Sequence, residues 1–350
     1  GTSGADEVVD LARRFLAALA VPVHIDGREL SVTASIGVLE CCTASMQAAQ
    51  IVQAADITMY RAKAQGRNRL AVFDEESNAR EISRYRLATR MPTALEEGEF
   101  FLEYQPLIAL DDGSVQSVEA LVRWRHPQQG VLGPDRFVGL AEETGLIVPL
   151  GRWVLQEACR QARAWQSRFP ERAPRINVNL SVRQARSPGL VDEVTRVLKD
   201  AQLDPTALQL EITESALIGA DDHALRALRE LTEMGVGLAL DDFGTGYSNF
   251  SRLRRLPVTS LKIDRSFIAG LQDADCCDPR DEKILAGLVS LAHTLDLAVT
   301  VEGVETALQA ERMRALQCET AQGWFFARPG PAEQISALCE RGGRVTALKG

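Results

Sequence analysis

Acidic and amide side chains, joined by one lysine, stand near the carboxyl ends of several hydrophobic segments that are typical of β-strands. They are Glu119, Asn179, Glu211, Glu214, Asp241, Asp242, Lys262, Asp264, Glu302 and Gln322. Carboxylates brought together at one place repel one another, and their pKa values shift unless cations compensate the charge. Oxygen donors without His or Cys favour Mg²⁺ or Mn²⁺ over Zn²⁺. The set therefore predicts a divalent-metal site.

The adjacent pair Asp241 and Asp242 indicates room for two ions. One carboxylate can bridge ions about 3.5 to 4 Å apart, an arrangement that suits phosphoester hydrolysis. The pair opens the segment DDFGTGYSNF, whose two glycines allow a sharp turn or a close approach to a ligand. We expect this loop to shape the metal site.

The elements that must position these side chains alternate between strand and helix from about residue 100 onward. The expected strands are residues 100–110, 115–124, 175–181, 207–214, 237–243, 260–267, 297–304 and 320–326. Amphipathic helices lie between most of them. Eight strands alternating with helices predict an α/β fold of the TIM-like (β/α)8 barrel type, with a doubly wound sheet as the alternative. Because only an Asp-Asp-Gly turn joins the first two strands, the first should be antiparallel in an otherwise parallel barrel.

A barrel of this type carries its active site at the carboxyl ends of its strands, where the acidic residues stand. Successive side chains of a strand point to opposite faces. In residues 261–264, the alternation sends Leu261 and Ile263 toward the helix-packed outside. Lys262 and Asp264 should then point into the barrel.

Composition limits the possible partners. The chain has 350 residues, 45% of them hydrophobic, which is enough to bury a large core. Its net charge of -9 argues against a basic face for duplex nucleic acid or anionic lipid.

Seven cysteines without a C-x-x-C motif fit a reducing compartment. No apolar run of 18 residues and no signal peptide occur, so we expect a cytoplasmic protein without a membrane segment in this chain. A membrane anchor upstream of it stays open.

Residues 1–75 form a separate α/β segment in this interpretation, with a hairpin whose turn is Asp26-Gly27. The strongly charged stretch 76–98 is expected to be a connecting helix, and the barrel domain should cover residues 99–345.

A series of motifs runs through residues 100–345, namely YQP, EALVRWRHP, AEETGLI, VNLS, EITES, DDFGTGYS, LKIDRSF, VEGVET and QGWFFARP. Together they resemble the EAL domain of bacterial cyclic-di-GMP phosphodiesterases. Residues 1–75 resemble the second half of a GGDEF (diguanylate cyclase) domain, through VTASIGV and ADITMYRAKAQGRNRLAVF. The GGDEF signature is absent, as is the first half of such a domain, so we expect no cyclase activity from this chain.

The resemblance implies a role for each matching position. One metal ion would be held by Glu119, Asn179, Glu211 and Asp241, and a second by Asp241 and Asp242 with Glu302 close to it. Glu302 would also be the general base for the attacking water, which Lys262 would orient or stabilise. Arg123 would contact a phosphate, where a guanidinium fork fits better than a point charge. The substrate would be framed by Gln105, Leu121, Asp264, Glu305 and Gln322, and Glu214 would anchor the DDFGTGYS loop.

The activity implied by the resemblance is hydrolysis of cyclic-di-GMP to linear pGpG with two Mg²⁺ or Mn²⁺ ions, by a homodimer that associates through the EAL domain. One alternative is a catalytically silent cyclic-di-GMP receptor. Another is an unrelated metal-dependent barrel enzyme that abstracts a proton next to a carboxylate, with Lys262 as its base. Arg123, Gln322 and the DDFGTGYS loop argue against the second alternative.

Overall fold

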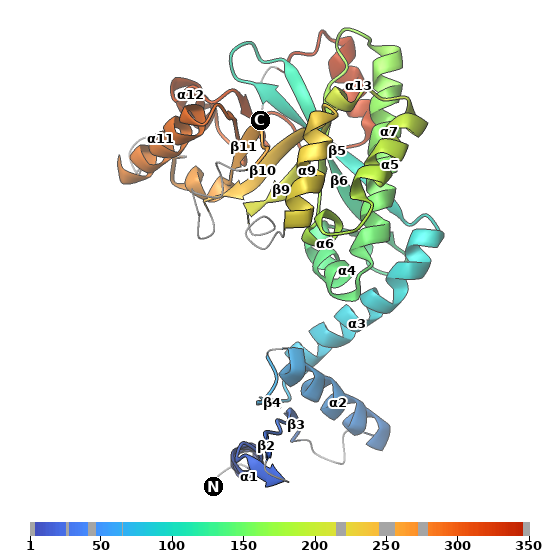
Figure 1. Ribbon diagram of the computed structural model, residues 1–350, viewed down its shortest axis with the longest axis vertical. Coiled ribbons are helices and arrows are strands. Elements are labelled where there is room, and N and C mark those ends of the chain that lie inside the picture. Colours follow the sequence, from blue (N-terminus) through green and yellow to red (C-terminus); the bar gives the residue numbers. More distant parts are fainter. Residues whose placement is uncertain are drawn as a thin grey trace. The chain divides into compact units, whose positions relative to one another are not determined.

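The computed structural model describes residues 4–25, 28–40, 47–64, 66–214, 222–244, 256–271 and 279–345. The chain divides into two compact units, residues 1–90 and residues 91–350 (Figure 1).

Among the described residues of the larger unit, eight strands close into a barrel. They are β5 (Phe100–Ala109), β6 (Val115–His126), β8 (Arg175–Asn179), β9 (Leu208–Thr213), β10 (Gly237–Phe243), β11 (Ser260–Ile263), β12 (Ala298–Val301) and β13 (Thr320–Ala321). They hydrogen-bond in this order around the ring, and β13 closes on β5. Each lies within or largely within one of the predicted strand segments. The predicted (β/α)8 barrel is confirmed, and the doubly wound alternative is wrong.

Strand β5 is antiparallel to both of its neighbours, as the short turn predicts. Gln105 pairs with Glu119 of β6, and Ile108 pairs with Ala321 of β13. The other pairings around the ring are parallel. Gly113 completes the β5–β6 turn at a φ of 74°, a conformation that glycine adopts without strain. A short strand that was not predicted, β7 (Gly130–Leu132), pairs with the end of β6.

Helices surround the barrel (Figure 1). They are α4 (Val138–Thr144), α5 (Ile147–Arg168), α6 (Val182–Ala185), α7 (Leu190–Ala201), α9 (Asp222–Glu233), α11 (Pro279–Thr294), α12 (Ala307–Ala315) and α13 (Ala332–Glu340). Their apolar faces and the outward side chains of the strands form one continuous core. In α11, Leu285, Val289 and Ala292 are buried at helical spacing. Full burial of a Leu or Val side chain contributes about 1.5–3 kcal/mol, so this outer layer holds the barrel closed.

The inside of the barrel is polar. In β11, Leu261 and Ile263 belong to the apolar core, whereas Lys262 between them lies on the other face. Deeper inward positions on neighbouring strands also carry polar side chains, such as Gln209 and Thr300. The strands therefore place apolar residues against the helices and polar residues around the barrel axis.

The smaller unit contains α1 (Gly4–Leu19), α2 (Ala48–Ala64) and two pairs of short strands. Strands β1 (Val23–Ile25) and β2 (Arg28–Leu30) are antiparallel, and the Asp26-Gly27 turn predicted between them lies outside the described residues. Strands β3 (Ile36–Val38) and β4 (Leu70–Val72) are parallel. A Cβ at Gly37 would collide with the backbone of α2, so glycine permits this close packing.

A long helix, α3 (Glu75–Glu96), continues from the first unit into the second. The domain limits expected at residues 75, 98 and 345 stay predictions. None of the helices in the described ranges combines the length and apolar character that a membrane span requires.

Candidate metal centre at the barrel mouth

Lys262 lies among carboxylates inside the barrel, with 1% of its surface exposed. Its Nζ is 2.5 Å from Glu302 Oε1, 2.7 Å from Glu211 Oε2 and 3.4 Å from Asp241 Oδ1. Glu119 Oε2 is 3.7 Å from the same nitrogen. The four carboxylates come from β6, β9 and β10 and from the residue that follows β12. Side chains that are far apart in the sequence thus meet around one buried ammonium group.

A chain of amide groups holds Glu119 from its other side. Asn179 Nδ2 donates to Glu119 Oε1 at 2.8 Å, and Gln322 Nε2 donates to Glu119 Oε2 at 2.8 Å. Gln322 Nε2 also donates to Gln105 Oε1 at 2.9 Å. The Gln105 amide in turn donates to the carbonyl of Ala327 at 3.0 Å. Both oxygens of Glu119 therefore have fixed donors, and three more of the predicted site residues join the cluster.

The adjacent aspartates both reach the site because β10 is irregular at this point. Its register with β11 shifts between Leu240 and Phe243, and Asp242 has a φ of 53°. Regular alternation would send Asp242 to the face opposite Asp241, whereas this left-handed residue breaks the alternation. The backbone N–H of Asp242 donates to Asp241 Oδ1 at 2.9 Å. Burial, and then the charge of Asp241, raise the pKa of Asp242.

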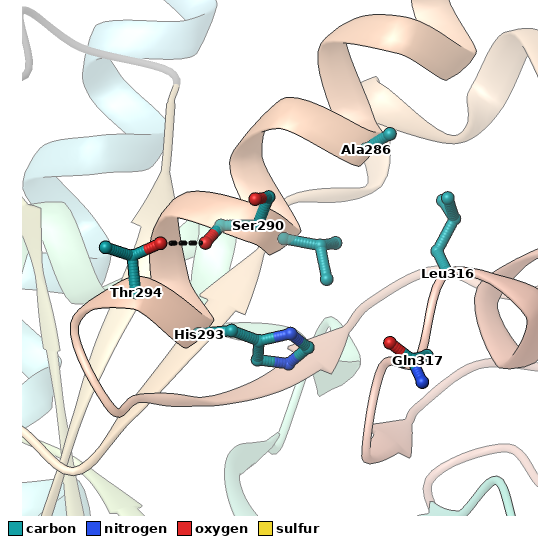
Figure 2. Close-up of a pocket in the computed structure, with 7 residues that line it drawn as sticks. Ala286, Ser290, His293, Thr294, Leu316 and Gln317 are labelled. Atoms are coloured by element: carbon teal, nitrogen blue, oxygen red, sulfur yellow. Dashed lines mark hydrogen bonds between the residues drawn. The ribbon is translucent and has the colours of Figure 1, made fainter.

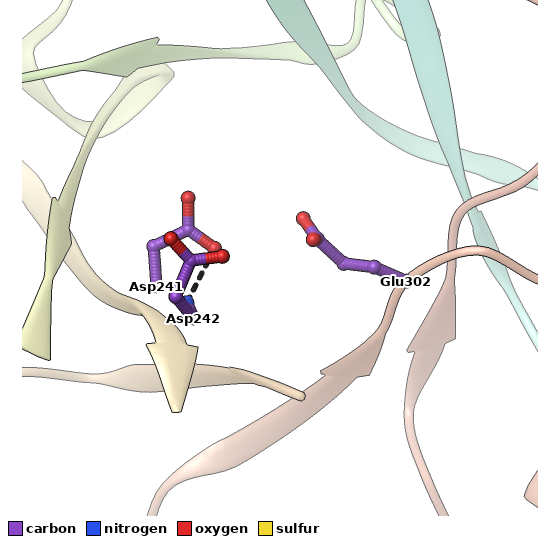
Figure 3. A group of neighbouring side chains, drawn as sticks. All are labelled: Asp241, Asp242 and Glu302. Atoms are coloured by element: carbon purple, nitrogen blue, oxygen red, sulfur yellow. Dashed lines mark hydrogen bonds between the residues drawn. The ribbon is translucent and has the colours of Figure 1, made fainter. Parts of the chain in front are cut away.

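Figure 3 shows Asp241 and Asp242 facing Glu302 from the other side of the site. One carboxylate oxygen of each residue lies within 4.8 Å of the corresponding oxygens of the other two. Such spacing lets a single cation contact several of these oxygens. The donors are all oxygens, and oxygen-only sites suit Mg²⁺ and Mn²⁺.

The charge balance of the cluster also favours an added cation. Four carboxylates, those of Glu119, Glu211, Asp241 and Glu302, form ion pairs with the same ammonium group of Lys262. Four negative charges against this one positive charge leave an excess of three if every group is ionised. Unpaired charge of this kind is costly away from water. The residues present therefore fit a divalent metal site.

Electrostatic strain in the cluster appears in the pKa values of two glutamates. Burial raises the pKa of Glu211 to about 8 and that of Glu302 to about 7, although the Lys262 ammonium acts in the opposite direction. For Glu119, burial also acts to raise the pKa, but Lys262 and the amide donors outweigh it and hold the pKa below its usual value. Without a metal ion, Glu211 and Glu302 thus retain protons near neutral pH, which reduces the negative charge of the cluster.

Two predicted substrate contacts follow Glu119 on the inward face of β6. Leu121 is half-buried, and Arg123 is paired with Glu103 of β5 through its Nε at 2.7 Å. The Arg123 side chain is 16% exposed. Its guanidinium group is thus already oriented by one carboxylate.

The remaining predicted residues surround the cluster. Asp264 is half-buried, and its Oδ1 accepts a hydrogen bond from the backbone of Ser266 at 3.0 Å. Glu305 is exposed on the loop after β12. Glu214 Oε2 accepts from the backbone N–H of Gly244 at 3.5 Å, which links β9 to the start of the DDFGTGYS loop. Residues 245–248 of that loop lie outside the described residues.

Two polar residues at this site were missed by the sequence analysis. Asn177 is fully buried and donates from Nδ2 to Glu211 Oε1 at 2.8 Å, and Glu103 binds Arg123. Each lies two residues from a predicted site residue on its own strand, Asn179 and Gln105 respectively. The alternation of strand side chains was the signal that could have found both.

A pocket of about 390 Å³ lies elsewhere on the barrel unit (Figure 2). Its lining comes from α11 and the turn that follows α12, and includes Ser290, His293 and Gln317. These positions precede β12 and β13, so they belong to the end of the barrel opposite the carboxylate cluster. The predicted site residues take no part in lining it.

Comparison with known proteins agrees with the motifs. Residues 88–329 match the EAL domain family, and residues 1–69 match the family described as diguanylate cyclase, GGDEF domain. Cyclic di-GMP phosphodiesterase NbdA of Pseudomonas aeruginosa is 41% identical over 321 residues, which cover 92% of this chain and 40% of NbdA. The bifunctional diguanylate cyclase/cyclic di-GMP phosphodiesterase MucR of the same organism is 41% identical over 331 residues, or 95% of this chain and 48% of MucR. The chain spans less than half the length of these two relatives.

Solved structures show the same similarity. The PaMucR phosphodiesterase in complex with c-di-GMP is 45% identical with a TM-score of 0.66, and the match covers 71% of this chain and 99% of that one. The FimX EAL domain of Pseudomonas aeruginosa bound to c-di-GMP is 27% identical with a TM-score of 0.63, over 70% of this chain and 96% of that one. With the family match covering more than half of its residues, the chain belongs to the EAL domain family.

Proposed function

We propose that this chain hydrolyses one phosphodiester bond of cyclic-di-GMP to give linear pGpG, in a reaction that requires two Mg²⁺ or Mn²⁺ ions. The observation that carries the proposal is the cluster of four carboxylates around Lys262 at the mouth of the barrel, with the Asp242 carboxylate beside Asp241 and Glu302. The naming of NbdA and MucR as cyclic-di-GMP phosphodiesterases and the c-di-GMP complex of PaMucR support the choice of substrate.

The acidic residues supply the metal ligands in this proposal. One ion would be held by Glu119, Asn179, Glu211 and Asp241, and a second would be held by Asp241 and Asp242, with Glu302 close to it. Bound metal would neutralise charge that develops on the phosphoryl oxygens and lower the pKa of a water molecule. Support comes from the oxygen-only donor set and from the excess of negative charge that Lys262 alone leaves.

Glu302 is proposed as the general base. It would accept a proton from the attacking water as the oxygen of that water bonds to phosphorus and the 3′-oxygen leaves. Its side chain is 22% exposed, more than those of Glu119 and Glu211, so it is the most accessible of these three glutamates to an attacking water. Lys262, 2.5 Å from Glu302, would keep this carboxylate oriented and help to hold the water.

The outer residues are proposed to bind the dinucleotide. Arg123 would contact a phosphate through the part of its guanidinium fork that Glu103 leaves available. Gln105, Leu121, Asp264, Glu305 and Gln322 would frame the rest of the ligand, and Glu214 would anchor the loop that begins at Asp241. A homodimer formed through the barrel unit stays a prediction, which sedimentation of the purified chain can test.

The test is incubation of the purified chain with cyclic-di-GMP and Mg²⁺ or Mn²⁺, followed by chromatography over time. We expect pGpG to accumulate in proportion to the enzyme concentration, and chelation of the metal with EDTA to stop it. Intact cyclic-di-GMP after long incubation at high protein concentration would contradict the proposal. If the protein nevertheless binds the dinucleotide, that outcome favours the receptor alternative.

A further inference from the structure

Asn177 is a fully buried polar residue beneath the proposed metal site, and neither the resemblance nor the comparisons assign it a role. It lies on β8 two residues before Asn179, so both side chains point to the inside of the barrel. Its Nδ2 donates to Glu211 Oε1 at 2.8 Å. Lys262 binds the other oxygen of the same carboxylate, Oε2, at 2.7 Å. Glu211 is therefore held by one donor on each oxygen.

The other end of the Asn177 amide shows that packing alone does not explain this residue. Its Oδ1 is buried and has no hydrogen-bond partner among the described residues. A buried acceptor without a partner costs free energy, and the interiors of such barrels are usually filled with branched apolar side chains. An apolar residue of similar size would fill the space without that cost. What the amide adds is the hydrogen bond to Glu211.

We propose that Asn177 is a positioning residue, which orients the Glu211 carboxylate so that it can bind the metal ion. The inference rests on the proposed function, in which Glu211 is a metal ligand. Each carboxylate oxygen accepts at two positions, so Glu211 can keep its bonds to Asn177 and Lys262 and still face a cation. Residues that hold a metal ligand in this way typically affect metal affinity by about 10-fold to 100-fold when they are replaced.

Gln209 provides a matched control. It pairs with Asn177 in the β8–β9 register, is also buried and also carries an amide. Its Nε2 donates to the Ser260 hydroxyl at 3.1 Å rather than to one of the clustered carboxylates. Replacing either amide with leucine removes a buried donor from the barrel interior. Of the two replacements, the one at Asn177 removes a donor to Glu211, whereas the one at Gln209 does not.

The experiment compares Asn177→Leu, Asn177→Ala and Gln209→Leu with the wild-type chain after all metal has been removed. Calorimetric titration with Mn²⁺ gives the dissociation constants. We expect Mn²⁺ binding to weaken by about 10-fold to 100-fold in both Asn177 variants, and by less than about 3-fold in Gln209→Leu. Kinetics should agree, because the Mn²⁺ concentration for half-maximal turnover should rise while the KM for cyclic-di-GMP at saturating Mn²⁺ stays near the wild-type value.

Several outcomes would overturn the inference. A folded Asn177 variant whose Mn²⁺ affinity lies within about 3-fold of wild type contradicts it, as does an equal loss in Gln209→Leu. If both Asn177 variants unfold even in saturating Mn²⁺, the residue is structural instead. The wild-type data keep the two proposals separate. Wild-type protein that binds no Mn²⁺ contradicts both, whereas normal wild-type binding and turnover with unaffected Asn177 variants contradict the positioning role alone.

Discussion

Lys262 compensates the buried carboxylate cluster, and its replacement by methionine should show how much of the barrel's stability depends on it. Methionine keeps most of the side-chain length and removes the charge. The substitution leaves Glu211, whose side chain is 0% exposed, and Glu119, at 8%, without their buried ammonium partner. It also removes the contact to Glu302 at 2.5 Å.

The expected cost is large because the contacts are short and buried. Glu119, whose pKa is held below its usual value, is the ionised partner, and at an effective dielectric constant of about 20 charges 3.7 Å apart, as in the Lys262–Glu119 pair, attract by roughly 4 kcal/mol. Burial of the ammonium group offsets part of this gain, and measured losses from breaking one side of a buried pair are about 3–5 kcal/mol. We expect a loss in that range in EDTA. A smaller loss is expected in saturating Mn²⁺, because the metal ion then supplies the positive charge.

The assay is urea unfolding followed by tryptophan fluorescence. All four tryptophans lie in residues 91–350, so their signal reports the barrel unit. Lys199→Met, on the exposed face of α7, is the matched control and should leave the midpoint unchanged. A loss below about 1 kcal/mol for Lys262→Met in EDTA would refute the reasoning, because the ammonium would then not be compensating the buried carboxylates.

Three further predictions test other parts of the account. The native barrel without metal retains protons on Glu211 and Glu302, with pKa values of about 8 and 7, which the unfolded chain releases near its ordinary value of 4.5. Its free energy of unfolding should therefore fall as the pH rises from about 5 to about 8, and Mn²⁺ should make this dependence on pH weaker. A free energy of unfolding that rises across this window contradicts the raised pKa values of Glu211 and Glu302. A Cβ at Gly323 would collide with the backbone of Val304. Gly323→Ala should therefore lower the free energy of unfolding by about 1–3 kcal/mol and lower the melting temperature. An unchanged melting temperature would show that the backbone around Gly323 and Val304 can move apart to fit the methyl group. Arg123→Lys replaces the planar guanidinium group and should raise the KM for cyclic-di-GMP by about 10-fold without changing the affinity for Mn²⁺. A weaker affinity for Mn²⁺ would show that Arg123 supports the metal site and not the phosphate of the substrate.

Much of the barrel could be predicted because its pattern is local. Alternating side chains identify β11 from Leu261 to Ile263, and the three-residue turn that ends at Gly113 determines that β5 is antiparallel. The short strand β7 was not predicted, since its three residues pair only with the end of β6. Its pairing depends on the register of a neighbour rather than on its own pattern.

The site residues that stand at the carboxyl ends of the barrel strands could be predicted from the sequence. Lys262 and its four carboxylate partners follow from the alternation and from the rule that barrel strands end at one mouth. The direction of Asp242 could not be predicted in this way, because it depends on a left-handed backbone at that one residue. Alternation places Asn177 on the same face as Asn179, but its contact with Glu211 on the next strand follows only from the folded register.

One paired measurement tests the central claim most directly. Wild-type chain and Glu302→Ala are each incubated with cyclic-di-GMP and Mn²⁺, and the bound dinucleotide and the linear product are measured in the same samples. We predict that wild type forms pGpG and that Glu302→Ala binds the dinucleotide yet hydrolyses it at least about 100-fold more slowly. If wild type returns only intact cyclic-di-GMP, the proposed hydrolysis is wrong. If Glu302→Ala turns over at nearly the wild-type rate, Glu302 is not the base.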